Sequence, residues 1–120
     1  MPKLLSGLEE DYTRPWGGYT RYTNNQQSTV KILTVKAGEE ISYQYHRQRD
    51  EIWIPLDPGL KVNLDDQLRP VTVNEIIEIK RGTKHQVIND TDHSIRWLEI
   101  SLGQFDENDN IRLRDKYGRT

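Results

Sequence analysis

The chain has 120 residues, of which 33% are hydrophobic, and a formal net charge of −2. Its length predicts one domain, its charge provides no basic surface for nucleic acid, and no apolar run approaches the roughly 20 residues of a membrane span. Cysteine is absent, which excludes disulfides and thiolate metal sites, and the first eleven residues lack the apolar run of a signal peptide, so we expect a cytoplasmic protein.

Short segments with strand character follow one another along the chain. We expect strands over Ser28 to Lys36, Ile41 to His46, Glu51 to Leu56, Leu60 to Leu64, Leu68 to Val73, Glu75 to Ile79, His85 to Ile88, Ile95 to Ser101 and Ile111 to Leu113. Many short strands at a spacing of roughly 8–12 residues predict a β-sandwich or barrel. Residues 1–12 and 115–120 are expected to be the flexible ends.

One of these segments alternates between polar and aromatic side chains. Gln44, His46 and Gln48 are separated by single residues, and Tyr43 and Tyr45 stand between and before them. In a strand, alternate residues face opposite sides. The pattern therefore predicts a polar inner face and an aromatic outer face, as in a small barrel with a wet pocket.

A carboxylate and a second histidine extend the polar row. Glu51 follows it closely, and His85 comes after a glycine turn at Gly82. Imidazole and carboxylate groups from separate segments are the ligands of a mononuclear metal site. A third histidine, His93, lies in a polar turn and is expected to be exposed.

The residues that carry these features resemble the two motifs of a cupin, a double-stranded β-helix or jelly-roll barrel. The first motif is matched from Gly38 through His46, Gln48 and Glu51, and the second by the glycine turn before His85. Gln48 stands where the cupin motif has its second histidine. The resemblance implies an all-β, single-domain jelly roll with its core at about residues 14–119.

Three further stretches narrow the resemblance to the type II phosphomannose isomerase cupin, which also ends the bifunctional mannose-1-phosphate guanylyltransferases. They are Arg14-Pro15-Trp16-Gly17-Gly18-Tyr19 at the start, Gln44 to Trp53 in the centre, and Arg112, Asp115, Tyr117, Gly118 and Arg119 at the end. The match covers Arg14 to Arg119 in order, and it includes no nucleotidyltransferase domain.

The resemblance implies a divalent metal ion. We expect His46, Glu51, His85 and Gln44 as ligands, with Gln48 either taking the place of the missing histidine or hydrogen-bonding a metal-bound water. Two imidazoles, a carboxylate and an amide suit a borderline ion, so zinc is expected, with nickel, iron and manganese as alternatives. Because an amide oxygen replaces an imidazole, we expect weaker metal binding than in a relative with the full histidine set.

The resemblance also implies a phosphorylated sugar as substrate and the interconversion of mannose 6-phosphate and fructose 6-phosphate. Arg112 is the first candidate to hold the phosphate, followed by Lys84, with Arg14 and Arg119 as further cations. The general base is left open: Glu51 is the nearest carboxylate, although a metal-bound carboxylate is a poor base, and Lys84 is the substitute.

Two other functions remain open. One is a non-catalytic cupin that binds a sugar phosphate or nucleotide sugar with a degenerate metal site, which Gln48 favours. The other is a metal-dependent dioxygenase, which fits less well because such cupins usually keep every histidine. Tyr43 and Tyr45, on the face opposite the metal row, are expected to pack against a second sheet or a second subunit, so we expect a homodimer.

Overall fold

The computed structural model describes residues 8–119. Across these residues the chain forms β-strands and one short 3-10 helix, η1 (Glu107–Asp109). The predicted all-β class is therefore confirmed. The same residues include no helix with the length and apolar content needed to cross a bilayer.

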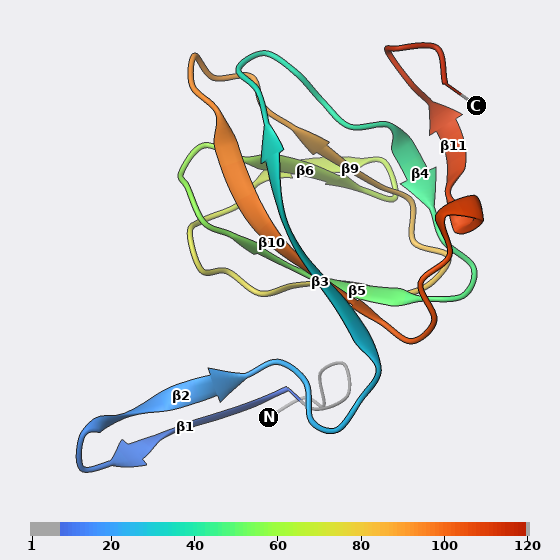
Figure 1. Cartoon of the computed structure of the whole chain (residues 1–120). Coiled ribbons are helices and arrows are strands. Elements are labelled where there is room, and N and C mark those ends of the chain that lie inside the picture. Colours follow the sequence, from blue (N-terminus) through green and yellow to red (C-terminus); the bar gives the residue numbers. More distant parts are fainter. Residues whose placement is uncertain (1–7, 120) are drawn as a thin grey trace.

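Two antiparallel sheets enclose the interior of the molecule (Figure 1). In spatial order, the four-stranded sheet contains β3 (Ser28–Val35), β10 (Ile95–Leu102), β5 (Asp50–Pro55) and β8 (Ile77–Ile79). The five-stranded sheet contains β11 (Ile111–Arg114), β4 (Tyr43–Tyr45), β9 (His85–Ile88), β6 (Lys61–Leu64) and β7 (Gln67–Pro70). From β3 onwards the chain passes repeatedly between the sheets, so strand neighbours come from distant parts of the sequence.

Apolar side chains from both sheets form the core between them. Trp53 and Trp97 contribute from the four-stranded sheet, and Val62 and Val87 from the five-stranded sheet. Each is at most 1% exposed. Removal of this apolar surface from water is the main stabilising contribution, and it holds the two inner faces in contact at one end of the barrel.

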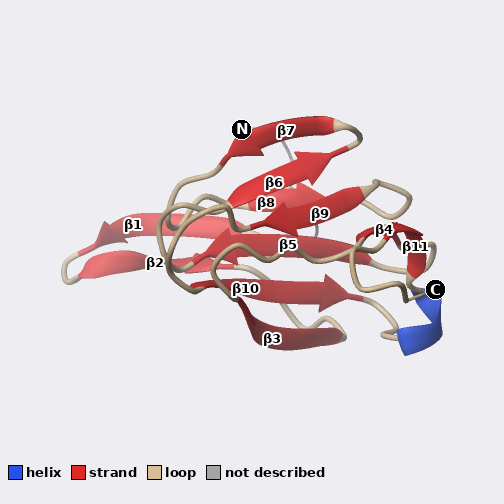
Figure 2. Cartoon of the chain, turned by 90° about the horizontal axis from the view of Figure 1, so that it is seen from above, coloured by secondary structure: helices blue, strands red, loops and turns tan. Residues whose placement is uncertain are grey.

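A hairpin of β1 (Glu9–Arg14) and β2 (Gly17–Arg21) extends away from the barrel (Figures 1 and 2). The sequence did not predict it, because its strands are polar and lack the apolar alternation used for the others. Local pairs hold it together: the Tyr12 and Thr20 hydroxyls are 2.8 Å apart, and Glu9 and Arg21 form an ion pair.

The ends predicted to be flexible are only partly described. Residues 9–12 belong to β1, while residues 1–7 lie outside the described residues, so the flexibility of these ends stays a prediction. Residues 115–119 form a turn that an ion pair between Arg119 Nε and Asp115 Oδ2 closes at 2.9 Å. The other predicted strands agree with the observed ones to within three residues at each end.

Tyr43, expected to pack against a second sheet or a second subunit, packs within its own chain. It is 3% exposed, its hydroxyl donates a hydrogen bond to Asp66 Oδ1 at 2.9 Å, and the Arg114 guanidinium lies 4.4 Å from its ring centroid. Tyr45 is half-buried. The homodimer stays a prediction.

Candidate metal centre

A row of polar side chains crosses the inner face of the five-stranded sheet. Gln44 of β4 pairs with His85 of β9 on one side and with Arg112 of β11 on the other. Directly paired residues of antiparallel strands place their side chains on the same face. His46 follows Gln44 by two residues and shares that face, so strand alternation brings these four side chains together.

Glu51 approaches this row from the opposite sheet. It lies on the inner face of β5 and pairs with Ser101 of β10, whose hydroxyl donates to Glu51 Oε2 at 3.2 Å. His46 Nε2 and His85 Nε2 are 3.1 Å apart. They lie 3.6 Å and 3.7 Å from Glu51 Oε2 and Oε1, respectively, and each of the three side chains is at most 2% exposed.

The other ring nitrogens fix the tautomers of the two histidines. His46 Nδ1 lies 2.9 Å from the Asp109 carbonyl oxygen and His85 Nδ1 lies 2.8 Å from that of Thr83. A carbonyl oxygen only accepts, so each Nδ1 carries a proton, and the Nε2 of each ring is the nitrogen that a metal ion can bind.

The cluster fits a divalent cation. Two imidazole nitrogens and a carboxylate converge within 4.8 Å of one another, and Glu51 Oε1 is buried without a hydrogen-bond partner. A buried polar atom without a partner is unfavourable, and a cation bound by these groups removes that penalty. The Nδ1 hydrogen bonds are the supporting contacts that orient metal-bound histidines.

Arg49 supplies the positive charge nearest to this cluster. Its Nη2 lies 3.2 Å from His46 Nε2 and its Nε donates to Glu51 Oε2 at 3.2 Å. The same guanidinium donates to Asn110 Oδ1 at 3.1 Å and to the Asp106 carbonyl at 3.2 Å. Arg49 thereby ties the loop around η1 to the cluster and offsets the buried charge of Glu51.

The environment keeps these groups in the protonation states that bind metals. Burial alone would raise the pKa of Glu51, but contacts with His46, His85 and Arg49 lower it to about 2. Burial lowers the pKa of His85 to about 4, against the opposing effects of Glu51 and the Thr83 carbonyl. Near neutral pH the carboxylate is therefore charged and His85 is neutral, as metal coordination requires.

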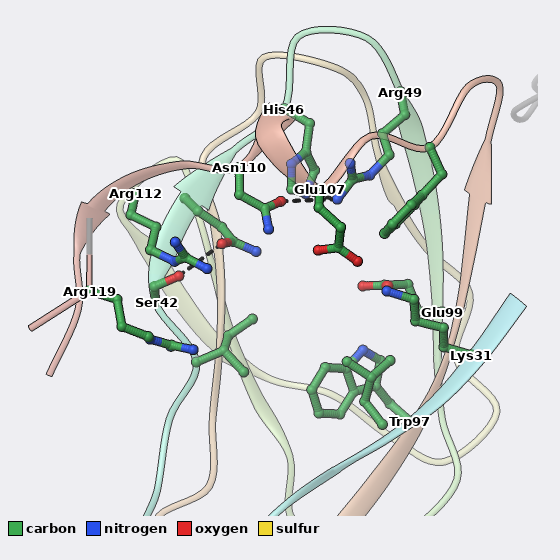
Figure 3. A pocket seen from close by; sticks show the side chains of 14 residues that line it. Lys31, Ser42, His46, Arg49, Trp97, Glu99, Glu107, Asn110, Arg112 and Arg119 are labelled. Atoms are coloured by element: carbon green, nitrogen blue, oxygen red, sulfur yellow. Dashed lines mark hydrogen bonds between the residues drawn. The ribbon is translucent and has the colours of Figure 1, made fainter. Parts of the chain in front are cut away.

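A cavity of about 170 Å³ lies beside the cluster, between the two sheets (Figure 3). His46 of the cluster and its neighbour Arg49 both line the cavity wall. Gln44 also lines the cavity, and its Oε1 accepts a hydrogen bond from Ser42 Oγ at 2.8 Å. The basic side chains in the wall are those of Lys31, Arg49, Arg112 and Arg119.

The structure does not bring Gln48 to the cluster. The chain bends after β4, and the Gln48 side chain is exposed at this bend. Asp109 fixes the bend, because its carboxylate accepts hydrogen bonds from the backbone nitrogens of Arg47 at 2.9 Å and Gln48 at 2.8 Å. The two-residue alternation used for the prediction ends with the strand, and Arg49 is the side chain that enters the site.

Two predicted phosphate ligands also lie away from the cavity. Lys84 is exposed, because it directly precedes the inward-facing His85 and strand alternation turns it to the other side. Arg14 ends β1 on the projecting hairpin and pairs with Asp11 at 3.4 Å. Of the predicted cations, Arg112 and Arg119 line the cavity.

Sequence reasoning did not single out three charged residues of the site. Arg49 lies within the central motif, three residues after His46, and its position there was the available signal. Lys31 and Glu99 lie on neighbouring strands, where they pair directly. Only the pairing of β3 with β10 places them in the cavity wall, and no local pattern predicts that pairing.

Comparison with known proteins decides the family. Residues 6–115 match the family model described as mannose-6-phosphate isomerase C-terminal. The chain belongs to this family. A mannose-1-phosphate guanylyltransferase of Salmonella montevideo is 36% identical over 107 residues, covering 88% of this chain and 23% of that protein. The alginate biosynthesis protein AlgA of Pseudomonas aeruginosa is 34% identical, covering 89% of this chain and 22% of its own length.

This member of the mannose-6-phosphate isomerase C-terminal family spans less than a quarter of the length of those two relatives. Among solved structures, a sugar phosphate isomerase of the cupin superfamily from Silicibacter pomeroyi superposes with a TM-score of 0.62 at 18% identity, covering 77% of this chain and 69% of that one. The likeness confirms the predicted cupin fold.

Proposed function

We propose that this chain is a metal-dependent isomerase that interconverts mannose 6-phosphate and fructose 6-phosphate. The observation that carries the proposal is the convergence of His46 Nε2, His85 Nε2 and the Glu51 carboxylate beside a cavity with a basic wall. His46 belongs to both features, so a molecule in the cavity lies next to the metal ligands. The family match supports this reaction as the first one to test.

The metal ligands we propose are His46, Glu51 and His85, with Gln44 as the neighbouring amide. Zinc is the expected ion, with nickel, iron and manganese as alternatives, because two imidazoles and a carboxylate suit borderline divalent ions. When bound, such an ion polarises a carbonyl oxygen as a Lewis acid. Glu51 faces both histidine Nε2 atoms and its Oε1 has no hydrogen-bond partner, so we assign it to binding the ion.

The phosphate group is proposed to bind at the basic part of the cavity wall. Arg112 extends inward from β11, and Arg119 reaches the same wall from the C-terminal turn. A guanidinium fork matches the geometry and charge of a phosphate dianion. Arg112 is therefore the side chain on which preference for a phosphorylated sugar should depend.

The test is turnover of mannose 6-phosphate by the purified chain after removal of metal and after addition of zinc, nickel, iron or manganese. We expect fructose 6-phosphate to form only with a metal. Binding of mannose 6-phosphate and of free mannose is measured alongside. Equal affinity for the two sugars would refute the phosphate site, and absence of turnover with all four ions would refute the isomerase.

A matched pair of variants locates the phosphate site. Arg112→Ala should weaken binding of mannose 6-phosphate by about tenfold or more, the loss of a charge-assisted contact. Arg114→Ala is the control, because Arg114 lies on the same strand but packs over Tyr43 outside the cavity. Equal effects of the two variants would show a general charge effect and no local site.

The second candidate function is a non-catalytic module that binds a sugar phosphate or nucleotide sugar. The position of Arg49 favours it, because a guanidinium already contacts His46 Nε2 and Glu51 Oε2, and because Gln48 adds no fourth ligand from the bend. Phosphate-dependent binding without turnover would support this function over the first.

The homodimer and the cytoplasmic location remain predictions. Sedimentation equilibrium of the purified chain measures the first, and cell fractionation the second.

A further inference from the structure

A buried carboxylate stands in the cavity wall without belonging to the cluster of metal ligands. Glu99 extends from β10 and is 8% exposed. It lines the same cavity as His46 and Arg112, and Figure 3 shows its carboxylate directed into the space between them. A molecule in the cavity therefore meets the carboxylate of Glu99 and the imidazole of His46 together.

Neighbouring strands hold this carboxylate in position. Glu99 pairs with Lys31 of β3 on one side and with Trp53 of β5 on the other, so the three side chains form a row on the inner face. Trp53 Nε1 donates to Glu99 Oε1 at 3.2 Å. Lys31 Nζ lies 4.1 Å from the Phe105 ring centroid, beside the cavity. The indole orients one carboxylate oxygen on a rigid strand.

Glu99 and Glu51 differ in what surrounds them. Glu51 is in contact with His46, His85 and Arg49, and its pKa is low. Burial, assisted by the negative charge of Glu51, raises the pKa of Glu99 to about 7. A group that both accepts and returns a proton works best when its pKa lies near the operating pH, and of these two carboxyls only Glu99 meets that condition.

We propose that Glu99 is the catalytic residue that moves the proton between C2 and C1 of the sugar phosphate. The inference rests on the proposed isomerase function and supplies the general base that neither Glu51 nor Lys84 provides. Glu51 is assigned to the ion and is ion-paired with Arg49, and Lys84 faces away from the cavity.

The proton transfer balances without any co-reactant. The Glu99 carboxylate takes the proton from C2 of open-chain mannose 6-phosphate. The electrons of the C2–H bond form a C1–C2 double bond, and the electrons of the carbonyl π bond move to O1. The proton of O2 passes to O1. The carboxyl group then returns its proton to C1 as C2 becomes a carbonyl, which gives fructose 6-phosphate.

Glu107 is the rival carboxylate, because it lines the same cavity. It lies in η1 and is exposed to solvent, where it is neither oriented by an indole nor shielded from water. The two glutamates therefore offer a direct comparison by the same Glu→Gln substitution, which keeps side-chain size and removes the charge.

The experiment measures incorporation of deuterium at C1 and C2 of the sugar phosphate in D₂O, with zinc-loaded parent, Glu99→Gln and Glu107→Gln. Glu99→Gln should lose exchange by about 100-fold or more, bind mannose 6-phosphate within about threefold of the parent and retain zinc. Glu78→Gln, on the outer face of β8, controls for the substitution itself. Glu99→Asp should retain part of the exchange.

The outcomes separate this inference from the proposed function. Exchange in Glu99→Gln within about tenfold of an active parent, or loss of exchange in Glu107→Gln alone, would overturn the role of Glu99 and leave the isomerase standing. A parent chain that binds the sugar phosphate but neither exchanges nor isomerises it with any of the four ions would overturn both. Loss of zinc together with exchange in Glu99→Gln would assign Glu99 to the metal site instead of proton transfer.

Discussion

The two ends of the barrel interior are equally buried and chemically opposite. At one end, Leu60 and Val62 are at most 1% exposed and pack in an apolar cluster. At the other, His46, Glu51 and Arg49 are at most 4% exposed and contact one another. The same two sheets thus enclose a dry core and a charged one.

The difference shows which end serves stability and which serves binding. Apolar burial stabilises the fold by roughly 25 cal/mol for each Å² removed from water. Buried charges carry a large desolvation penalty that pairing only partly offsets, and well-packed apolar residues often replace them without loss of stability. A buried cluster of imidazoles and carboxylate is therefore best explained by something that it binds.

Removing a metal ligand at the charged end should have the largest effect of the changes considered, and the effect is a loss of zinc affinity. His46→Ala and His85→Ala should each weaken zinc binding by at least about 100-fold, because residues 8–119 bring three close ligands together and losing a ligand costs more than losing a hydrogen-bond partner of a ligand. Titration calorimetry and metal analysis measure this. His93→Ala, at an exposed histidine, is the matched control, and a parent-like zinc content in the two inner variants would place the ion elsewhere.

Removing apolar volume at the other end should destabilise the fold and leave zinc binding unchanged. Leu60→Ala should lower the free energy of unfolding by about 2–5 kcal/mol, the usual cost of a buried Leu→Ala cavity. Urea unfolding in the presence of a chelator measures it. Zinc affinity should be unchanged, and a parallel loss of zinc binding would show that the two ends are energetically coupled.

Glu99, at the edge of the charged end, provides a further test of the comparison. Its protonation should make the stability of the fold depend on pH. Its raised pKa, about 7, contributes stability that is fully present below the unfolded-state value and is lost as pH rises through 7. Glu99→Gln lacks this contribution. From pH 5 to pH 8 the stability of the variant relative to the parent should therefore rise, by up to about 3 kcal/mol.

His85 acts in the opposite direction but cancels in this difference. Its pKa is lowered to about 4, so both chains gain stability as pH rises from there to the unfolded-state value. Urea unfolding of the two chains at several pH values, with a chelator present, measures the difference. A difference that stays constant from pH 5 to pH 8 would show that Glu99 is not buried as the structure has it.

The sequence predicts the placement of a site residue correctly where strand alternation continues. It fails where contacts with distant segments set the position of the side chain. Gln44 and His46 share a face because both belong to one extended segment. Gln48 departs because Asp109, 61 residues away, fixes the bend. Glu99 reaches the cavity because β10 pairs with β3 and β5. No local sequence pattern predicts which distant strands pair.

The variant with the smallest expected effect tests the bend that follows β4. Gln48→His restores the histidine of the cupin motif, and from the sequence alone this change should tighten metal binding. In the structure the Gln48 side chain is exposed and its backbone is held by the Asp109 carboxylate, so an imidazole there does not reach His46 Nε2.

We therefore expect the zinc dissociation constant of Gln48→His to stay within about twofold of the parent, a change below 0.5 kcal/mol. Gln44→His is the matched comparison, because it places the same imidazole on the inner face beside His85, where a nitrogen ligand should tighten zinc binding relative to the amide. Titration calorimetry with zinc measures both variants. A tighter Gln48→His with an unchanged Gln44→His would mean that the bend turns inward when metal binds, and that alternation continues past the end of β4.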